Sequence, residues 1–369
     1  MADSLRMEAY QQVIKRLVTT ETVVVEIGTG AGIQALMAAR AGAKHVYAVE
    51  PADSIEVAKA VAKENKLDDR ISFFREISTK IDLPEKADLV MSDLRGVLPW
   101  LWHHIPTIVD ARERLLKPSG CLVPQEDTVW AVPIESEEIY EKYAAPWKKH
   151  NYGFDYSRAF NMSINSWSRE RPARESFLAS KAKVATLNYR EITEPSMEAE
   201  LSFEPVRGGK IHGFAVWFDG LYYDDIRLTN APYKKELAYG SAFFPIASPV
   251  DVKKNDSIHL RLKALYANGE YTWVWETDVF TANGDTKASH KQSTLKGKLF
   301  SFDKLKKRMA SYRPALDESG RVRQDAFNLM AENLSVREIS TQLYAKHNSA
   351  FRNSTEALEL VRDLSEKYG

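Results

Sequence analysis

A glycine-rich turn and a later glutamate are the residues with the clearest chemical meaning in this sequence. The turn reads Glu26-Ile27-Gly28-Thr29-Gly30-Ala31-Gly32 and follows a β-branched run that predicts a strand. Glycines there let the backbone approach a ligand closely, because side chains would collide with it. Glu50 ends the next predicted strand, at the spacing where a carboxylate accepts hydrogen bonds from two ribose hydroxyls. Together these features predict a nucleotide site.

The spacing of the glycines bears on which nucleotide binds. A dinucleotide site that holds a pyrophosphate shows Gly-x-Gly-x-x-Gly, whereas Gly32 of this chain comes one residue earlier. S-adenosylmethionine has no phosphate, which relaxes that requirement. The turn alone does not choose between nucleotides, and a tight strand-to-helix turn without a ligand is the structural alternative.

Alternating strand and helix patterns surround the turn. The predicted strands are residues 22–27, 45–49, 71–74 and 87–91, and the predicted helices are 33–41, 54–64 and 106–116. This alternation predicts a doubly wound, Rossmann-like α/β domain over residues 1–124.

A different texture follows Pro124. Short segments such as Thr128 to Val132 alternate apolar and polar residues, which predicts an antiparallel, β-barrel-like domain over residues 125–298. Residues 161–187 are rich in Ser, Arg and Ala, and we expect them to form an inserted helical or irregular arm.

Residues 299–369 predict a small helical module, in which Ser335 is placed to cap a helix through Glu338 and Ser354 or Thr355 begins another. Its segment Leu334 to Ile339 resembles small winged-helix peptide-binding proteins. A helix-turn-helix of this kind equally binds DNA or stabilises a dimer, so its role stays open. Its nearly balanced charge makes nucleic acid the less favoured partner.

Composition excludes several classes of protein. The 369 residues hold 51 Lys and Arg against 51 Asp and Glu, so an acidic or nucleic-acid partner needs a local patch. The one cysteine, Cys121, excludes internal disulfides and a multi-cysteine metal site, and we expect it to be buried. No apolar run reaches the roughly 20 residues that span a bilayer. With no signal-peptide pattern in residues 1–6, we expect a cytoplasmic protein without a membrane partner.

The wider pattern resembles the protein arginine methyltransferase family over about residues 3–280. The similar segments are the N-terminal signature Asp3-x-x-Arg6-x-x-x-Tyr10, the first motif at 26–33, the second strand at 41–50, and Tyr152-Gly153-Phe154-Asp155 at the entry to the dimerisation arm. The resemblance implies S-adenosylmethionine as cofactor, methyl transfer to a peptide, protein or small-molecule acceptor, and a homodimer.

The resemblance also implies cofactor contacts at particular residues. Arg6 is expected to bind the methionine carboxylate, for which a guanidinium is a natural clamp. Glu50, with Pro51 beside it, is expected at the ribose. The segment Glu76-Ile77-Ser78 is expected at the adenine, and Glu26, Gly28, Gly30 and Gly32 belong to the first motif.

The loop that would hold an arginine substrate departs from the family pattern. Two glutamates of the family grip the substrate guanidinium, but here the first is replaced by Asp93 and the second by Trp102. An aspartate is one methylene shorter, and an indole cannot accept a hydrogen bond from a guanidinium. The Thr-His-Trp loop of the family aligns with Leu237-Ala238-Tyr239, so its histidine is replaced as well.

Two interpretations follow from these departures. In the first, the acceptor is another amine, hydroxyl or carboxylate, which Asp93 and His103 orient or deprotonate; the adjacent His104 is the alternative, because only one of the two can face the site. Trp100 and Trp102 then stack on a substrate, or pack within the loop. In the second, the chain is a catalytically silent scaffold that binds the cofactor and a peptide or protein partner.

Overall fold

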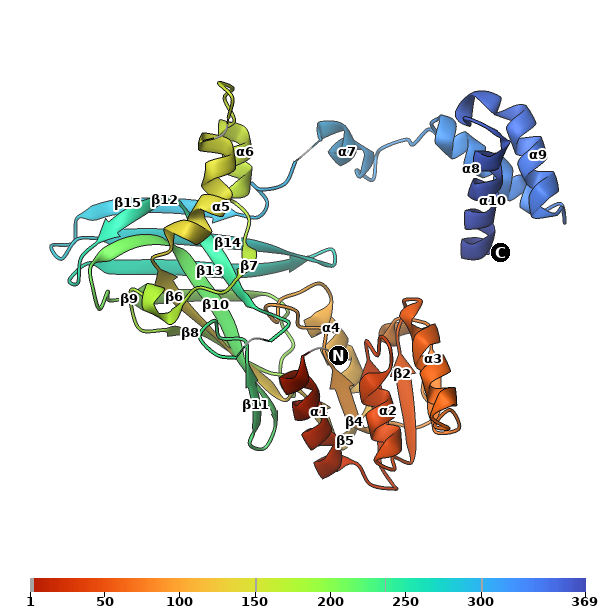
Figure 1. Cartoon of the computed structure of the whole chain (residues 1–369), viewed down its shortest axis with the longest axis horizontal. Coiled ribbons are helices and arrows are strands. Elements are labelled where there is room, and N and C mark those ends of the chain that lie inside the picture. The colour runs from red at the N-terminus through yellow and green to blue at the C-terminus, as the bar shows by residue number, and fades with distance from the viewer. Residues whose placement is uncertain (1–2, 150, 236, 300) are drawn as a thin grey trace. The chain divides into compact units, whose positions relative to one another are not determined.

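The computed structural model describes residues 3–149, 151–235, 237–299 and 301–369. The chain separates into two compact units, Met1–Lys298 and Leu299–Gly369. The first unit holds a parallel sheet with its helices and two antiparallel sheets, and the second is helical (Figure 1). No helix within the described ranges is long and apolar enough to cross a membrane.

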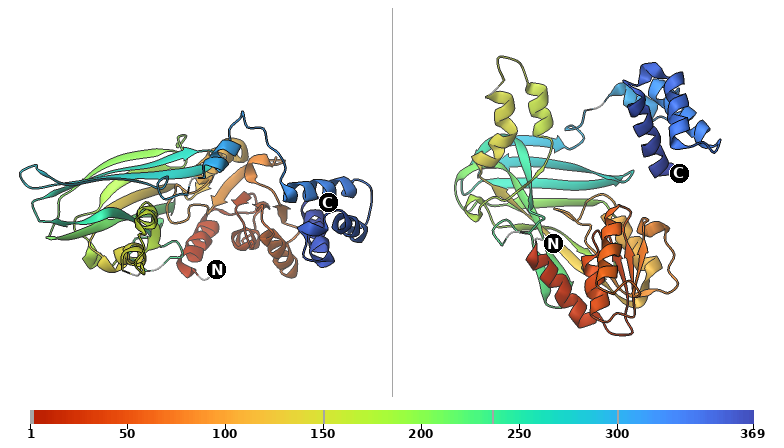
Figure 2. Two further views of the ribbon diagram at one scale, coloured as in Figure 1. Left: turned by 90° about the horizontal axis from the view of Figure 1, so that it is seen from above. Right: turned by 45° about the vertical axis from the view of Figure 1, so that its right-hand side comes forward.

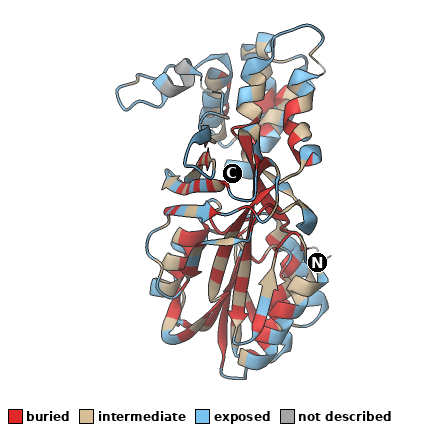
Figure 3. Ribbon diagram, turned by 90° about the vertical axis from the view of Figure 1, so that its left-hand side faces the viewer, coloured by how far each residue is buried: buried red, intermediate tan, exposed pale blue. Residues whose placement is uncertain are grey.

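A five-stranded parallel sheet forms the first half of the larger unit, and the sequence predicts four of its strands but not the last, Leu116–Val123. Its strand order is β3-β2-β1-β4-β5. The strands are β1 (Val23–Ile27), β2 (His45–Val49), β3 (Ile71–Phe74), β4 (Ala87–Ser92) and β5 (Leu116–Val123). The helices are α1 (Ser4–Leu17), α2 (Ile33–Arg40), α3 (Ser54–Glu64) and α4 (His104–Asp110). The central strands are buried along their length (Figure 3), which explains their continuous apolar sequence.

One helix of this layer is shorter than predicted. The expected helix over 106–116 divides into α4, a π-helical turn at Ala111–Leu115, and the start of β5 at Leu116. Pairing decides the boundary, because Leu116 lies opposite Ala87 in the parallel ladder of β4 and β5.

Two antiparallel sheets form the predicted β-barrel-like part. Their orders are β7-β12-β10-β6-β8, with β11 paired to β10, and β15-β14-β13-β9. The strands are β6 (Glu126–Ile134), β7 (Ser168–Glu170), β8 (Ala182–Asn188), β9 (Met197–Phe203), β10 (Gly209–Tyr223), β11 (Ile226–Thr229), β12 (Ser241–Val252), β13 (Ser257–Ala267), β14 (Glu270–Phe280) and β15 (Thr286–Ser293). The sheets lie face to face (Figure 2) and share one core, in which the indole of Trp275 donates to the Pro245 carbonyl at 2.8 Å.

The inserted arm lies earlier in the chain than expected. A helical hairpin of α5 (Glu137–Lys148) and α6 (Ser157–Ser163) projects from the antiparallel sheets (Figure 1), whereas residues 168–170 and 182–187 of the expected 161–187 segment enter the sheet in β7 and β8. Strand β8 buries Val184 and Leu187 against β6, so tertiary pairing overrides its polar composition. The arm is therefore the α5–α6 hairpin, whose two helices flank Tyr152-Gly153-Phe154-Asp155.

The second unit contains α7 (Phe302–Lys307), α8 (Glu318–Met330), α9 (Val336–Lys346) and α10 (Ser354–Tyr368). Ser335 and Glu338 form the predicted capping box at the start of α9. Helices α8 to α10 share a core that includes Val322, Leu343 and Val361. Residues 301–369 contain no strand, so the β wing that a winged-helix module needs is absent from that range and the expected resemblance extends only to the helices.

Candidate functional site

The glycine-rich turn and Asp93 lie at the point where the strand order of the parallel sheet reverses. Strand β1 leads into the turn and its neighbour β4 leads into Asp93, and parallel strands end at the same edge. Ligands of open α/β sheets bind outside the carboxyl ends of the strands at such a reversal. The topology therefore places the predicted cofactor turn and the predicted acceptor loop side by side.

All three glycines of the turn have the left-handed backbone for which glycine is suited. Their φ angles are +79° at Gly28, +53° at Gly30 and +86° at Gly32. A Cβ atom at Gly28 would lie 2.7 Å from Leu94 Cδ2, whereas a Cβ at Gly30 would meet no atom within 4 Å. The turn is thus closed on the Leu94 side and open at Gly30, where a ligand can approach the backbone.

Glu50 is held next to this turn by backbone hydrogen bonds. Its Oε2 accepts from the Gly30 amide at 2.9 Å, and its Oε1 accepts from the Ala52 amide at 3.0 Å. A carboxylate fixed beside the open Gly30 is placed to accept hydrogen bonds from the ribose of S-adenosylmethionine, and the backbone at Gly30 is accessible to the same ligand. Pro51 is exposed next to it.

Glu26 has a different environment from Glu50. It is buried at the end of β1, where its Oε2 accepts from the Thr29 hydroxyl and from the Ala35 amide, the latter at 2.7 Å. Burial raises the pKa of Glu26 to about 7, although both hydrogen bonds oppose the shift. Its contacts brace the turn internally.

The segment expected at the adenine follows β3 and lies at the same edge of the sheet. Glu76 is partly buried, and its Oε1 accepts from the Ile77 amide at 2.8 Å. Ile77 is exposed, and Ser78 is buried where a 3₁₀ turn begins. The exposed Ile77 side chain offers an apolar surface for a planar ring.

The carboxylate of Asp93 is held on both oxygens by side chains of this chain. Arg6 of α1 donates to Oδ2 at 2.9 Å, and the Tyr239 hydroxyl donates to Oδ1. Arg95 lies 3.7 Å from Oδ1. The Asp3 side chain caps α1 by accepting from the Arg6 amide and accepts from the Ala238 amide at 2.8 Å, which fastens the helix to the 237–240 loop.

Arg95 belongs to a fully buried network that was not predicted. Its guanidinium donates to Asp127 of β6 at 2.7 Å and to the Tyr222 hydroxyl, and Asp127 also accepts from Tyr189. Although burial opposes the charged form, the Asp127 carboxylate holds the pKa of Arg95 above its usual range. A charged residue in the middle of an apolar loop, Leu94-Arg95-Gly96-Val97, was the sequence signal for a buried ion pair.

The two histidines and two tryptophans of the loop separate into buried and exposed members. His103 Nδ1 lies 2.8 Å from the Tyr266 hydroxyl, against the β13–β14 turn, and the described contacts of His103 include none with Asp93. His104 is buried against Tyr189, and burial with the nearby Arg95 charge lowers its pKa to about 3. The structure therefore gives no support to a catalytic role for His103. Trp100 is core, whereas Trp102 is 71% exposed.

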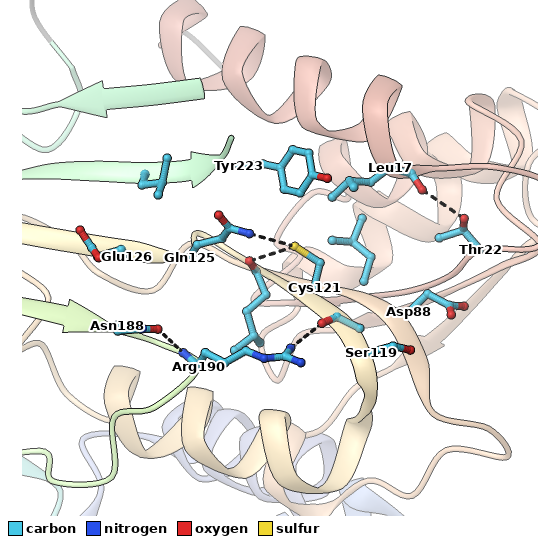
Figure 4. A pocket seen from close by; sticks show the side chains of 14 residues that line it. Leu17, Thr22, Asp88, Ser119, Cys121, Gln125, Glu126, Asn188, Arg190 and Tyr223 are labelled. Atoms are coloured by element: carbon cyan, nitrogen blue, oxygen red, sulfur yellow. Dashed lines mark hydrogen bonds between the residues drawn. The ribbon is translucent and has the colours of Figure 1, made fainter. Parts of the chain in front are cut away.

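A cavity of about 580 Å³ lies at the opposite edge of the parallel sheet (Figure 4). Cys121 lines it and is partly exposed, which corrects the expectation of a buried cysteine. Arg190 also lines this cavity and donates to the Gly120 carbonyl, so this arginine is hydrogen-bonded to β5. The cavity is formed at the amino ends of β1 and β4 and is separate from the cofactor turn.

Two family models match the chain. A model of the arginine methyltransferase oligomerization subdomain matches residues 125–271, and a model of ribosomal protein L11 methyltransferase matches residues 5–144. Protein arginine N-methyltransferase PRMT10 of Arabidopsis thaliana is 27% identical over 300 residues, which cover 71% of this chain and 78% of that protein. A probable histone-arginine methyltransferase CARM1 of rice (Oryza sativa subsp. indica) is 32% identical over 212 residues, 54% of this chain but 40% of that protein.

The fold of the chain is also similar to that of solved arginine methyltransferase structures. A chain of the Trypanosoma brucei PRMT1 enzyme-prozyme heterotetrameric complex with AdoHcy superimposes with a TM-score of 0.71 at 20% identity, covering 79% of this chain and 95% of that one. The parallel sheet with its glycine turn, together with the matched methyltransferase model, defines an S-adenosylmethionine-dependent methyltransferase. More particularly, the chain is similar to protein arginine methyltransferases, in residues 125–271 to their oligomerization subdomain and over 71% of its length to one of them.

Proposed function

We propose that this chain transfers a methyl group from S-adenosylmethionine to a nucleophile of a peptide, protein or small metabolite other than an arginine guanidinium. The observation that supports this proposal is the hydrogen bonding of Asp93, whose two carboxylate oxygens accept from Arg6 and Tyr239. A substrate guanidinium would meet the positive charge of Arg6 at this carboxylate, and Trp102 stands in place of the second glutamate.

The proposed chemistry divides between cofactor and protein. S-adenosylmethionine supplies a methyl group on a sulfonium, to which the acceptor donates a lone pair as the carbon–sulfur bond breaks. Arg6, the turn glycines and Glu50 are the proposed cofactor contacts, with Pro51 and Glu76 to Ser78 around them. Asp93, fixed from two sides, is a rigid hydrogen-bond acceptor that orients the acceptor group.

A silent scaffold is the second candidate function, and the same closed network around Asp93 favours it. Turnover distinguishes the two. The enzyme is incubated with labelled S-adenosylmethionine and either arginine-rich peptides or a peptide and metabolite extract. We expect release of S-adenosylhomocysteine with the extract and no methylarginine on the peptides. Robust methylarginine would overturn the proposed acceptor class, and cofactor binding without turnover on any acceptor would establish the scaffold.

We also propose a homodimer formed through the α5–α6 hairpin. The match of residues 125–271 to an oligomerization subdomain supports it. So do the aromatic side chains at the hairpin tip, since Tyr152 is 90% and Phe154 is 67% exposed. A cytoplasmic location is a further proposal, and cell fractionation tests it.

A further inference from the structure

A cavity of about 620 Å³ lies beside the Asp93 centre, by which we mean Asp93 with its hydrogen-bond donors Arg6 and Tyr239. Its lining includes Asp3, Arg169, Arg171, Ala238 and Gly240. The cavity and the Asp93 centre share the 237–240 loop, because Ala238 and Gly240 line the cavity while Tyr239 between them turns to Asp93. An acceptor that lies in the cavity therefore passes next to the loop that holds Asp93.

Two guanidinium groups are fixed at this cavity by the loops around it. Arg169 donates to the Ala238 carbonyl at 2.9 Å and packs so closely on Gly240 that a Cβ there would lie 2.5 Å from its Cγ. Arg171 donates to the Lys234 carbonyl at 2.8 Å. Both arginines donate these hydrogen bonds to backbone carbonyls, which are neutral. The hydrogen bonds therefore orient the two guanidinium groups without neutralising their charge.

The carboxylates of the cavity are already engaged. Glu170 pairs with Lys142 at 2.7 Å, and Asp3 accepts from the Ala238 amide and caps α1. Among residues 3–149, 151–235, 237–299 and 301–369, no carboxylate forms an ion pair with Arg169 or Arg171. Glu236 lies outside these ranges.

The surroundings add positive charge. Lys234 and Lys235 are exposed in the segment that follows Pro232, whereas the charge of Lys142 is balanced by Glu170. Arg6 and Arg95 do not add to this charge, because they pair with Asp93 and Asp127. A chain with equal numbers of acidic and basic residues thus carries a local cationic patch at this position.

We infer that the methyl acceptor is carried on an acidic peptide segment, whose carboxylates bind Arg169 and Arg171. This inference rests on the proposed function and names its substrate class. Guanidinium and carboxylate pair in a bidentate geometry, which gives register as well as attraction. An arginine-rich peptide would instead meet the like charges of Arg169 and Arg171 in the same cavity.

The test measures binding, so that it does not depend on turnover. Fluorescent peptides of alternating Glu and Ala, alternating Lys and Ala, and neutral Ser and Ala are titrated with the full chain in the presence of S-adenosylhomocysteine, together with a single-stranded oligonucleotide. We expect the acidic peptide to bind at least about tenfold more tightly than the neutral one, since a hydrogen bond to a charged group contributes that much. The basic peptide should bind no better than the neutral one.

Variants then locate the binding site. Arg169→Gln with Arg171→Gln keeps side-chain donors for the two carbonyls and removes both charges, and it should weaken acidic-peptide binding by about tenfold or more. Arg227→Gln with Lys254→Gln removes two exposed charges elsewhere and should leave the affinity within about twofold. Equal binding of the three peptides, an unchanged affinity of the first variant, or tighter binding of the oligonucleotide would each overturn the inference. Methylation of arginine peptides would overturn the proposed function instead, which keeps the two failures distinguishable.

Discussion

The guanidinium of Arg6 lies 2.9 Å from the carboxylate of Asp93, although the two residues are 87 positions apart. The contact joins the first turn of α1, the proposed clamp for the methionine carboxylate, to the loop proposed for the acceptor. Arg6 thereby lies between the proposed cofactor contacts and the proposed acceptor loop.

Replacing this arginine should weaken cofactor binding. Arg6→Ala removes a charge-assisted hydrogen bond of about 1.5–3 kcal/mol, so we expect the Kd for S-adenosylhomocysteine to rise by about tenfold or more. Isothermal titration calorimetry measures it. Arg16→Ala is the matched control, because Arg16 is on the same helix but pairs with Asp224 and Asp225 at the surface. Equal affinities of a folded Arg6→Ala variant and the control would remove Arg6 from the site.

Glu50 should be the strongest single contact of the nucleotide. Two ribose hydroxyls would lose a charged acceptor in Glu50→Ala, at about 1.5–3 kcal/mol for each hydrogen bond. Because Glu50 also fixes the Gly30 amide, Glu50→Gln separates the loss of charge from the loss of the turn contact and should show a smaller effect. The readout is the Kd for S-adenosylhomocysteine, with Glu56→Gln of the exposed face of α3 as control. Unchanged binding in Glu50→Ala would show that the nucleotide lies elsewhere.

Glu26 should make the stability of the larger unit depend on pH. Burial raises the folded-state pKa of Glu26 to about 7 from 4.5. The folded state then binds the proton more tightly than the unfolded state, so unfolding free energy falls as the pH rises from about 4.5 to 7 and is constant above. The shift corresponds to roughly 3 kcal/mol. Urea unfolding across this range should show that decline in wild type relative to Glu26→Gln, with the exposed Glu21→Gln behaving as wild type. Parallel profiles of wild type and Glu26→Gln would refute the assignment.

The geometry of the glycine turn and the place of Glu50 beside it could be predicted from sequence because their signal is local. Three glycines that need a left-handed backbone and an acid one strand later all act within a single βαβ unit. The surroundings of Asp93 could not be predicted in this way. Tyr239 lies 146 positions from Asp93, and the Arg95–Asp127 pair spans the junction of the parallel and antiparallel sheets. Such partners are set by how the sheets dock, which no local pattern reports.

The arm shows the same limit in the secondary structure. The Ser-, Arg- and Ala-rich composition after residue 161 favours an irregular segment, but β8 within it pairs with β6 and gains its stability there. The helical hairpin instead starts at α5, where Ser136 caps the first turn by accepting from the Ile139 amide. Its cap was visible in the sequence, but the lone Pro146 near its end obscured the helical pattern.

Charge at the tip of the hairpin should break the proposed homodimer. Tyr152→Glu with Phe154→Glu places two carboxylates where exposed aromatic side chains are proposed to meet a second copy. Multi-angle light scattering at micromolar concentration should show a dimer for wild type and a monomer for the variant. Val206→Glu, an exposed apolar residue away from the hairpin, should remain dimeric. A wild-type monomer would count against the arm as an interface.

Arginine methylation should be recoverable only if two changes are combined. The carboxylate at position 93 must lose the hydrogen bond from Tyr239, and a second carboxylate must be added at position 102. Asp93→Glu with Trp102→Glu restores the pair of acidic side chains, but Tyr239 still donates to the residue at 93 and Arg6 still binds its other oxygen. Since a buried cation needs a free and well-placed counter-charge, we expect this double variant to produce no more methylarginine than wild type. Adding Tyr239→Phe frees one oxygen and keeps the aromatic ring. We expect the triple variant to produce methylarginine on arginine-rich peptides, detected by mass spectrometry, and Tyr239→Phe alone to produce none. If the double variant already methylates arginine, the hydrogen bond from Tyr239 is not what closes the site, and the shortened carboxylate and the indole at 102 account for the specificity on their own.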